Sequence, residues 1–351
     1  MSFVSAYVER RTKKNKFFNQ IDSVIDWQPI EKEINKAYKK GSDVVGRKAY
    51  PGIMLFKMLL VGIWYGLSDE RTEEMVCENL SASKFCGLEV EDDVPDHSVL
   101  SRFRKELTEK RAFDRIFNKV NQQLKEKKVL VKGCVKVDAS ITETPLIPSS
   151  KPTFVMAEDR EEDDRNQDDV DAEQKQQEWI KENDTGADYE ARWLKKGNKS
   201  KYGYKKHHAV DVEGLVVGVH TTTANEHDSN GLEPLIKKVD PDFLKQGVYT
   251  DKGYKVPKND ELLKSKGIKN RIQRKAYRNR PLTKWEKLFN KLISKSRYVV
   301  ERTFGGMKRW FGAGVARYKG LALTHTQHVL EAIAYNLYRT PGIIVSRPVG
   351  I

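Results

Sequence analysis

The sequence predicts an α/β chain, in which an all-helical N-terminal region precedes a mixed sheet with helices on its faces. Three observations support this. Apolar residues recur at helical spacing over residues 1–128, where no strand pattern competes. Near Lys132 the apolar period changes from 3.6 to two. Strand-like and helix-like segments then alternate along residues 129–345, as in a sheet covered by helices.

The helical region contains three clear apolar repeats and one basic helix. The repeats are IMLFKMLLVGIWYG, EEMVCENL and RAFDRIFNKVNQQL. Before the last repeat, Pro95 and Asp96 form a break and a cap for a short helix that carries Arg102, Arg104 and Lys105. Helix, turn and basic helix together favour DNA binding, with an ordinary basic surface helix as the alternative.

The second region begins with the strand GCVKVDAS and then meets an acidic stretch, residues 158–184, which we expect to be an insertion without a core. A Lys-rich loop leads to HHAVDV and LVVGVHTTT, which predict a β-hairpin. The segments HDSNGLEPLIKKV, GVYT, NDELLKSKG and IKNRIQ predict helix, strand, helix and strand. A long amphipathic helix follows from about Leu282 to Gly312.

The charge favours a nucleic-acid partner. The chain has 64 Lys plus Arg against 50 Asp plus Glu, a net charge of +14. Residues 158–184 hold 13 acidic and 4 basic residues, so the rest of the chain carries +23. Residues 267–309 hold 14 basic and 2 acidic residues, with aromatic residues among them, which suits phosphates and stacked bases. A merely soluble basic protein is the alternative.

The cysteines and the apolar runs favour a cytoplasmic protein without a membrane partner. Three cysteines form no CxxC pair, so neither a disulfide framework nor a structural zinc site is indicated. The N-terminus lacks a secretory apolar region. The most apolar run, Ile53 to Gly66, is interrupted by Lys57 and too short to span a bilayer, so we expect a buried helix.

Three carboxylates fall where metal chemistry would need them. Asp138 ends the first predicted strand, Asp251 ends the fourth, and Glu301 lies in the last helix. Arg297, Glu301 and Lys308 fall within roughly 40° on that helix. A surface stripe and a turn-forming aspartate are the simpler explanations. Two Mg²⁺ ions about 4 Å apart, held by such oxygen ligands, activate water or a 3′-hydroxyl on nucleic acid.

Several motifs occur together in a fixed order: PDHSVLSRFR, VDAS, DYEARW, KYGYKKHHAVD, TTTANEHDS, YTDKGY and RYVVERTFGGMKRW. With this ordered set the chain resembles the DDE-class transposases of bacterial insertion sequences, most closely the insertion sequence five family. The resemblance covers most of the chain. It implies an RNase H-like catalytic core at residues 129–345 and a helical region at residues 1–128 that recognises inverted repeats.

The resemblance also implies roles for single residues. Asp138, Asp251 and Glu301 match the metal-binding catalytic triad. Arg297 and Lys308 match the basic members of the family's Y-R-E-K signature. Its tyrosine position is Ser294 here, a departure that puts the tyrosine's DNA contact in doubt.

Further candidates lie near these motifs. Tyr298 could take over part of the missing tyrosine's contact, and Trp310 could stack on a displaced base, with core packing as the alternative. Asp188 lies in DYEARW, for which a capped helix is the plain alternative. For the pairs His207–His208 and His325–His328 we expect structural roles rather than metal binding.

The expected function is therefore a transposase that binds the terminal inverted repeats of its insertion sequence and catalyses Mg²⁺-dependent DNA cleavage and strand transfer. Two ions are expected, Mn²⁺ can substitute, and target DNA and a homodimer assembled on DNA complete the partners. An RNase H-like nuclease without sequence preference is one alternative. A DNA-binding regulator with a decayed catalytic site is another. We also hypothesise that the acidic insertion shields the basic face in the free protein.

Overall fold

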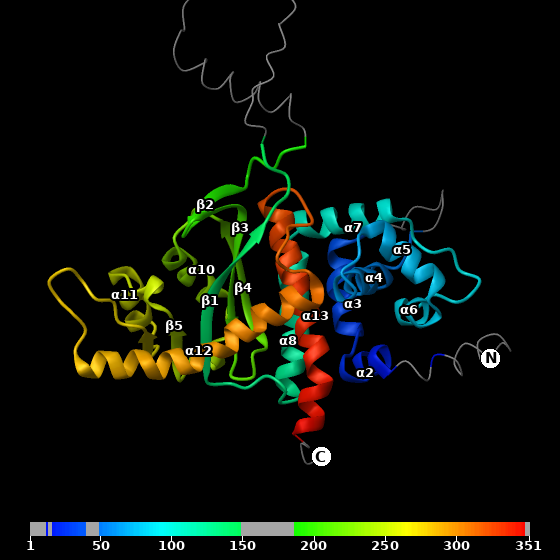
Figure 1. The fold of residues 1–351 in the computed structure, drawn as a ribbon. Coiled ribbons are helices and arrows are strands. Elements are labelled where there is room, and N and C mark those ends of the chain that lie inside the picture. The colour runs from blue at the N-terminus through cyan, green and yellow to red at the C-terminus, as the bar shows by residue number, and fades with distance from the viewer. Residues whose placement is uncertain (1–11, 13–15, 40–48, 149–185, 348–351) are drawn as a thin grey trace, which may run out of the picture.

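The computed structural model describes residues 12, 16–39, 49–148 and 186–347 (Figure 1). The predicted acidic insertion at residues 158–184, and the hypothesis attached to it, lie outside these residues. Seven labelled helices form the described N-terminal region: α2 (Lys16–Val24), α3 (Gln28–Ala37), α4 (Gly52–Trp64), α5 (Asp69–Glu78), α6 (Leu80–Cys86), α7 (His97–Glu109) and α8 (Ala112–Glu126).

The local signals in the sequence explain where these helices begin. Ser68 caps α5 by accepting a hydrogen bond from the backbone N–H of Arg71. Asp96 caps α7 by accepting one from Ser98, as predicted. Helix α4 is apolar on almost every side and buried, which confirms the prediction of a buried helix in this run.

The sheet is mixed. Its described strands are β1 (Cys134–Glu143), β2 (Arg192–Lys196), β3 (Lys199–Val210), β4 (Val216–Thr223), β5 (Gly247–Thr250) and β6 (Asn270–Ile272). The order is β2-β3-β1-β5-β6, and β4 also pairs with β3. Strand β3 is antiparallel to β1, β2 and β4, whereas β1, β5 and β6 are mutually parallel. Together with the helical N-terminal region, this confirms the predicted fold class.

Short helices join the strands on the faces of the sheet, as the segment order predicts. Helix α10 (Leu232–Lys238) precedes β5, and α11 (Pro257–Ser265) lies between β5 and β6. Three 3-10 helices occur beside them: η1 (Asp228–Gly231), η2 (Pro241–Phe243) and η3 (Lys252–Tyr254). The last of these begins directly after Asp251 and so fixes how that residue leaves its strand.

The prediction of a Lys-rich loop is wrong, and the capped helix considered as an alternative for DYEARW is absent as well. Residues 192–210 form the β2–β3 hairpin rather than a loop, with Lys196 opposite Lys199 at its tip. The motif DYEARW forms a turn followed by β2, not a capped helix. Most side chains of β2 are exposed, so the segment lacks the apolar alternation by which a half-buried strand is recognised.

The two longest described helices are α12 (Lys284–Phe311) and α13 (Leu321–Ser346). Helix α12 confirms the predicted amphipathic helix. Thr283 and Glu286 form a capping box at its start, and Gly312, at φ 65°, ends it in the left-handed conformation. Helix α13 has no counterpart among the predicted elements.

Helix α13 joins the helical region to the sheet. It contacts β4 and also α2, α4, α7 and α8, and in Figure 1 it stands between β4 and α4. The Trp64 indole N–H donates a hydrogen bond to the carbonyl of Ala334, 2.9 Å away. Buried apolar residues from both regions therefore form one continuous core.

No single described helix is both long and apolar enough to cross a membrane. Helices α4 and α5 reach that length and composition only when taken together, across a bend of 104°.

A buried ion pair fixes α13 against the sheet. Lys206 Nζ on β3 lies 2.8 Å from Glu331 Oε2, and both side chains are fully buried. Lys206 also donates to the carbonyl of Ala313, and the Gln327 amide donates to the other oxygen of Glu331. Because each charge has such partners, removing one partner leaves the other charge buried and uncompensated.

We expect Lys206→Met to destabilise the protein by about 3–5 kcal/mol, because the Glu331 carboxylate would stay buried without its cation. Urea unfolding followed by circular dichroism measures this. The matched control is Lys237→Met, which removes an exposed pair with Glu233 and should leave the unfolding midpoint unchanged. Equal midpoints for the two variants would show that the buried pair does not hold α13 in place.

Candidate active site

Two of the predicted acidic residues lie side by side on neighbouring strands. Asp138 lies within β1, which continues to Glu143 rather than ending at Asp138 as predicted, and Asp251 directly follows β5. In the parallel pair of β1 and β5, Lys136 stands opposite Tyr249, so Asp138 and Asp251 are level two residues further on. Asp251 Oδ1 accepts a hydrogen bond from Gly253 N–H, 2.9 Å away, and thereby caps η3. The turn-forming explanation of Asp251 is thus correct, and the same turn places its carboxylate beside Asp138.

Helix α12 brings the third acid over the same face of the sheet. Asp138 is paired across the sheet with His208, whose ring stacks on Phe304 of α12 at 4.9 Å. Opposite residues of an antiparallel pair point to the same face, so Asp138 faces α12 as well. Arg297 Nη2 donates to Asp138 Oδ2 at 2.8 Å and lies 3.8 Å from Glu301 Oε1.

This small cluster has an excess of negative charge in a partly buried place. Burial raises the pKa of Asp138, and the charge of Asp251 adds to that rise, while Arg297 and the Ala139 N–H oppose it. The side chain of Asp138 is 18% exposed and that of Glu301 is 61% exposed. Asp138 is therefore shielded, while Glu301 borders the solvent.

The donor set fits a divalent cation. Three carboxylates supply the oxygen ligands that Mg²⁺ prefers. A cation already lies among them, because the Arg297 guanidinium contacts two of the three acids. The buried Nε of Arg297 has no hydrogen-bond partner among the described residues.

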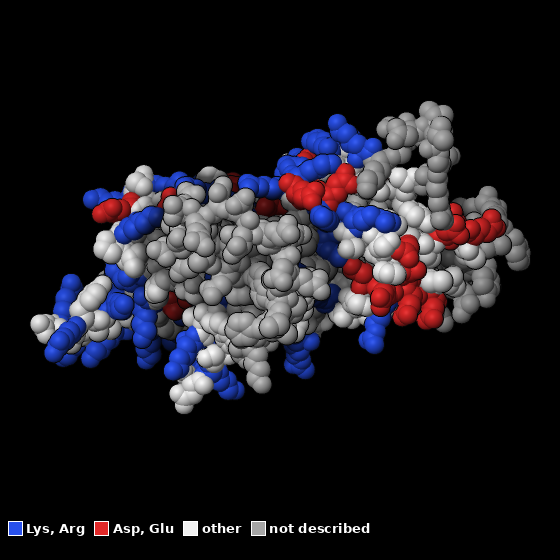
Figure 2. Space-filling view, turned by 90° about the horizontal axis from the view of Figure 1, so that it is seen from above, with Lys and Arg blue, Asp and Glu red and all other residues white. Residues whose placement is uncertain are grey.

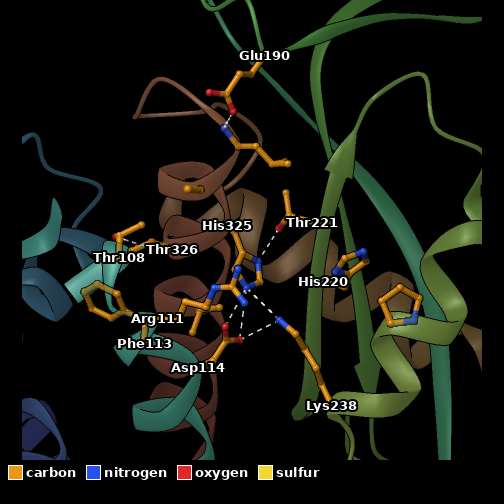
Figure 3. Close-up of a pocket in the computed structure, with 14 residues that line it drawn as sticks. Thr108, Arg111, Phe113, Asp114, Glu190, His220, Thr221, Lys238, His325 and Thr326 are labelled. Carbon is orange, nitrogen blue, oxygen red and sulfur yellow. Dashed lines mark hydrogen bonds and ion pairs between the residues drawn. The ribbon is translucent and has the colours of Figure 1, made fainter. Parts of the chain in front are cut away.

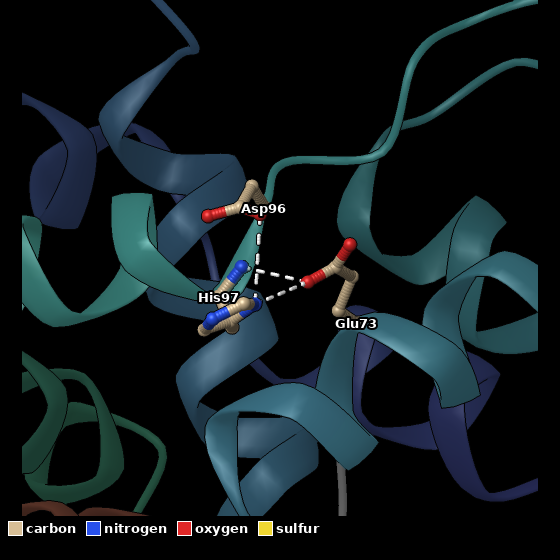
Figure 4. Close-up of side chains that lie close together, drawn as sticks. All are labelled: Glu73, Asp96 and His97. Atoms are coloured by element: carbon tan, nitrogen blue, oxygen red, sulfur yellow. Dashed lines mark hydrogen bonds and ion pairs between the residues drawn. The ribbon is translucent and has the colours of Figure 1, made fainter.

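The three acids do not form a closed cage as they lie. Over the described ranges, one group of acidic and histidine side chains has all its ligand atoms within 4.8 Å of one another: Glu73, Asp96 and His97 (Figure 4). There Glu73 accepts a hydrogen bond from the backbone N–H of His97 at 2.7 Å. A second hydrogen bond, between Glu73 and the His97 ring, raises the pKa of that ring. These contacts tie α5 to the capped start of α7, which is a sufficient structural role.

The sheet edge contributes one residue that the sequence motifs did not point out. Thr250 stands opposite Ile272 in the parallel pair of β5 and β6, so Gln273 follows at the level of Asp251. Its amide donates to Ser294 Oγ, 2.7 Å away, at the position where the family signature has tyrosine. The only signal available beforehand is that Gln273 follows a strand parallel to the one before Asp251.

The other predicted residues of α12 lie near its exposed side. Tyr298 is exposed, with the Arg302 guanidinium 5.7 Å from its ring centre. Lys308 has a lowered pKa because of its partial burial and the nearby charges of Lys206 and Lys201. Trp310 is partly exposed but packs against α13, with its ring 5.1 Å from that of Tyr338.

The predicted basic residues of α7 divide into two groups. Arg102 and Lys105 are exposed. Arg104 is buried, donates to both carboxylate oxygens of Asp69 at 2.9 and 2.6 Å, and stacks on Tyr318. The expectation that Arg104 binds DNA is therefore corrected: its charge is already satisfied inside the protein.

Asp188 and His207 have partners within the protein, whereas the ring nitrogens of His208 have none among the described residues. The hydroxyl of Tyr204 donates to the buried Asp188 carboxylate, which also accepts from Gly320 N–H. His207 lies near the hydroxyls of Tyr254 and Thr222. His208 is fully buried, and neither of its ring nitrogens has a partner.

A cavity of about 530 Å³ lies away from the triad, between the helical region, β4, α10 and the start of α13 (Figure 3). In it, burial opposes the ionisation of Asp114, but the hydrogen bond and charge of His325 and the charge of Lys238 hold its pKa at about 2. His325 Nδ1 and His328 Nδ1 share the hydroxyl of Thr221. These contacts hold four elements, α8, α10, β4 and α13, together around the cavity.

Comparison with known proteins gives matches in both regions of the chain. The family model described as Transposase DDE domain matches residues 169–337, and Transposase domain (DUF772) matches residues 6–106. The transposase for insertion sequence element IS1106 of Neisseria meningitidis serogroup B is 34% identical over 240 residues, which is 68% of this chain and 76% of that protein. No solved structure matches the chain.

Buried histidines predict how stability depends on pH. Burial lowers the pKa of His207 to about 3, and it lowers those of His208 and His328 well below 6.5. Below about pH 6.5 the unfolded chain binds protons that the folded chain does not, so stability falls as the pH falls. Each such histidine adds up to about 1.4 kcal/mol per pH unit to that slope.

We expect His208→Phe to reduce this slope by up to about 1.4 kcal/mol per pH unit, because phenylalanine keeps the stack on Phe304 and cannot take up a proton. Chemical unfolding at several pH values between 6 and 4 measures the slope for both proteins. An identical slope in the wild type and the variant would mean that His208 is protonated in the folded state.

Proposed function

Since the chain belongs to the DDE-domain transposases of bacterial insertion sequences, we propose that Asp138, Asp251 and Glu301 are its catalytic triad. As a member of that family the protein is an enzyme that acts on DNA and uses a divalent metal. The finer proposal is that it binds the terminal inverted repeats of its own element, cleaves the DNA there and transfers the strand. The observation that carries it is that Asp138 and Asp251 lie level on neighbouring strands while Arg297 contacts both Asp138 and Glu301.

Asp138 and Asp251 would hold two Mg²⁺ ions, for which Mn²⁺ can substitute, and Glu301 would hold one of them. When bound, these ions would activate the attacking oxygen and stabilise the departing one. The chain's own residues orient the triad: the β1–β5 register sets the two aspartates, and the η3 cap fixes the direction of Asp251. The length of α12 carries Glu301 across the sheet.

We propose that Arg297 exchanges partners when DNA binds. In the described structure its guanidinium neutralises Asp138 and approaches Glu301. A DNA phosphate offers the same planar group a bidentate partner of equal charge, which frees the two carboxylates for metal. Lys308 lies on the same line of α12, and we propose that it holds the backbone on the other side of Glu301.

Recognition of the element ends is assigned to residues 1–128, with the exposed Arg102 and Lys105 of α7 as the basic contacts. Tyr298 and the exposed part of Trp310 would contact DNA beside the triad. Residues 129–345 form the proposed catalytic region. Cutting two ends together requires two active sites, so we propose that a homodimer assembles on DNA.

The test is cleavage of a duplex that carries the DNA flanking this gene, in Mg²⁺, by the wild type and by Asp251→Asn and Glu301→Gln. Asparagine can keep the cap of η3 while it removes the charge. We expect both variants to bind the duplex like the wild type. Their cutting rates should fall by at least roughly 1,000-fold.

Asp240→Asn is the matched control, because Asp240 caps η2 in the same way, and it should cut normally. If the wild type binds the ends but cuts in neither Mg²⁺ nor Mn²⁺, the protein is a DNA-binding regulator. Indiscriminate cutting would identify a nuclease without sequence preference. Full activity of Asp251→Asn would remove the proposed triad.

A further inference from the structure

The first half of α12 carries an exposed apolar strip, whose Trp285 ring stacks on Phe289 of the same helix with the ring centres 5.2 Å apart. Trp285, Leu288 and Leu292 are 62%, 56% and 58% exposed. At about 100° per residue they fall on the same side of the helix as Val299 and Thr303, which are buried in the second half. The strip therefore continues one border of the buried face of α12, while Ile293, on the middle of that face, is buried in the first half as well.

The strip is uncovered because α12 is longer than the surface beneath it. Its 28 residues span about 42 Å, and Figure 1 shows its first half reaching beyond the strands toward α11. This half is nevertheless held in place. The Asn290 side chain accepts from Arg274 N–H and donates to its carbonyl, and Gln273 donates to the Asn290 carbonyl. The strip is thus presented by a rigid helix.

Cations border the strip on both sides. Lys284, Lys291 and Lys295 are spaced seven and four residues apart, so they form one row along its edge. On the other edge, the Arg274 guanidinium lies 5.0 Å from the ring centre of Phe289. Figure 2 shows Lys and Arg side chains gathered at the end of the molecule that carries α11 and the start of α12.

We propose that this strip binds DNA whose bases are unpaired, with the bases on the apolar centre and the phosphates on the cationic edges. Aromatic side chains among lysines and arginines are the common means of holding single strands. A second copy of the chain fits less well, because it would bring the same 14 basic and 2 acidic residues of the 267–309 segment against themselves.

The position of the strip suits this role. Trp285 and Glu301 are 16 residues apart on one helix, or about 24 Å, which is roughly seven base-pair steps of DNA. The inference rests on the proposed function, since strand cleavage at the triad would produce ends whose bases can separate. A strand opened there can reach the strip without leaving the helix that carries Glu301.

The test compares two labelled probes by fluorescence anisotropy in EDTA: a short duplex, and the same duplex with a single-stranded thymine extension. The wild type should bind the extended probe more tightly. Trp285→Ala should weaken binding of the extended probe by about tenfold and leave binding of the plain duplex unchanged. Trp285→Phe, which keeps a ring, should restore most of the lost affinity.

Val345→Ala removes an exposed apolar side chain at the far end of α13 and should change neither affinity. Equal effects of Trp285→Ala on both probes, or no effect, would overturn the proposal. Loss of self-association in Trp285→Ala, measured by sedimentation, would overturn it in favour of a second copy. Because binding is measured without metal, its outcome is independent of the cleavage test.

Discussion

The contact of Arg297 with Asp138 and Glu301 is the interaction on which the arrangement of the site depends. It joins the middle of β1 to the middle of α12, two elements separated by more than a hundred residues of sequence. Neighbouring structural features position the residues that make this contact. The parallel register places Asp251 beside Asp138, the Thr283 capping box and Gly312 set the ends of α12, and Phe304 packs that helix on His208. One cation thus holds two carboxylates that would otherwise repel each other.

The helical region is fixed to this site by packing and hydrogen bonds. Tyr318, between α12 and α13, stacks on the buried Arg104 of α7, and Arg317 donates to the carbonyls of Gly62 and Leu67. Helix α13 then shares its core with both regions. The exposed basic face of α7 is therefore held at a fixed position relative to the sheet, and we infer that DNA bound there would have a defined path toward the triad.

Much of this could be predicted from the sequence, because the local signals were strong. The strand at Asp138, the hairpin, the strand before Asp251 and the long helix with Glu301 all have clear periodicity or caps. Helix α13 was missed because it is buried on nearly every side while its sequence mixes polar with apolar residues and contains Pro341, so no single period stands out. The burial of Arg104 depends on Asp69, 35 residues earlier, and the level of Gln273 depends on strand pairing. Neither the burial of Arg104 nor the position of Gln273 can be inferred from the spacing of residues along the sequence.

The most direct test of the central claim is Mn²⁺ binding, measured by electron paramagnetic resonance without DNA, for the wild type, Arg297→Gln and Arg297→Gln/Asp138→Asn. If Arg297 occupies the place of a metal ion, Arg297→Gln binds Mn²⁺ more tightly than the wild type, and the added Asp138→Asn change abolishes that gain. Glu73→Gln, in the other carboxylate cluster, should leave the gain intact. If Arg297→Gln binds no more Mn²⁺ than the wild type, or if Glu73→Gln removes the signal, the triad is not the metal site.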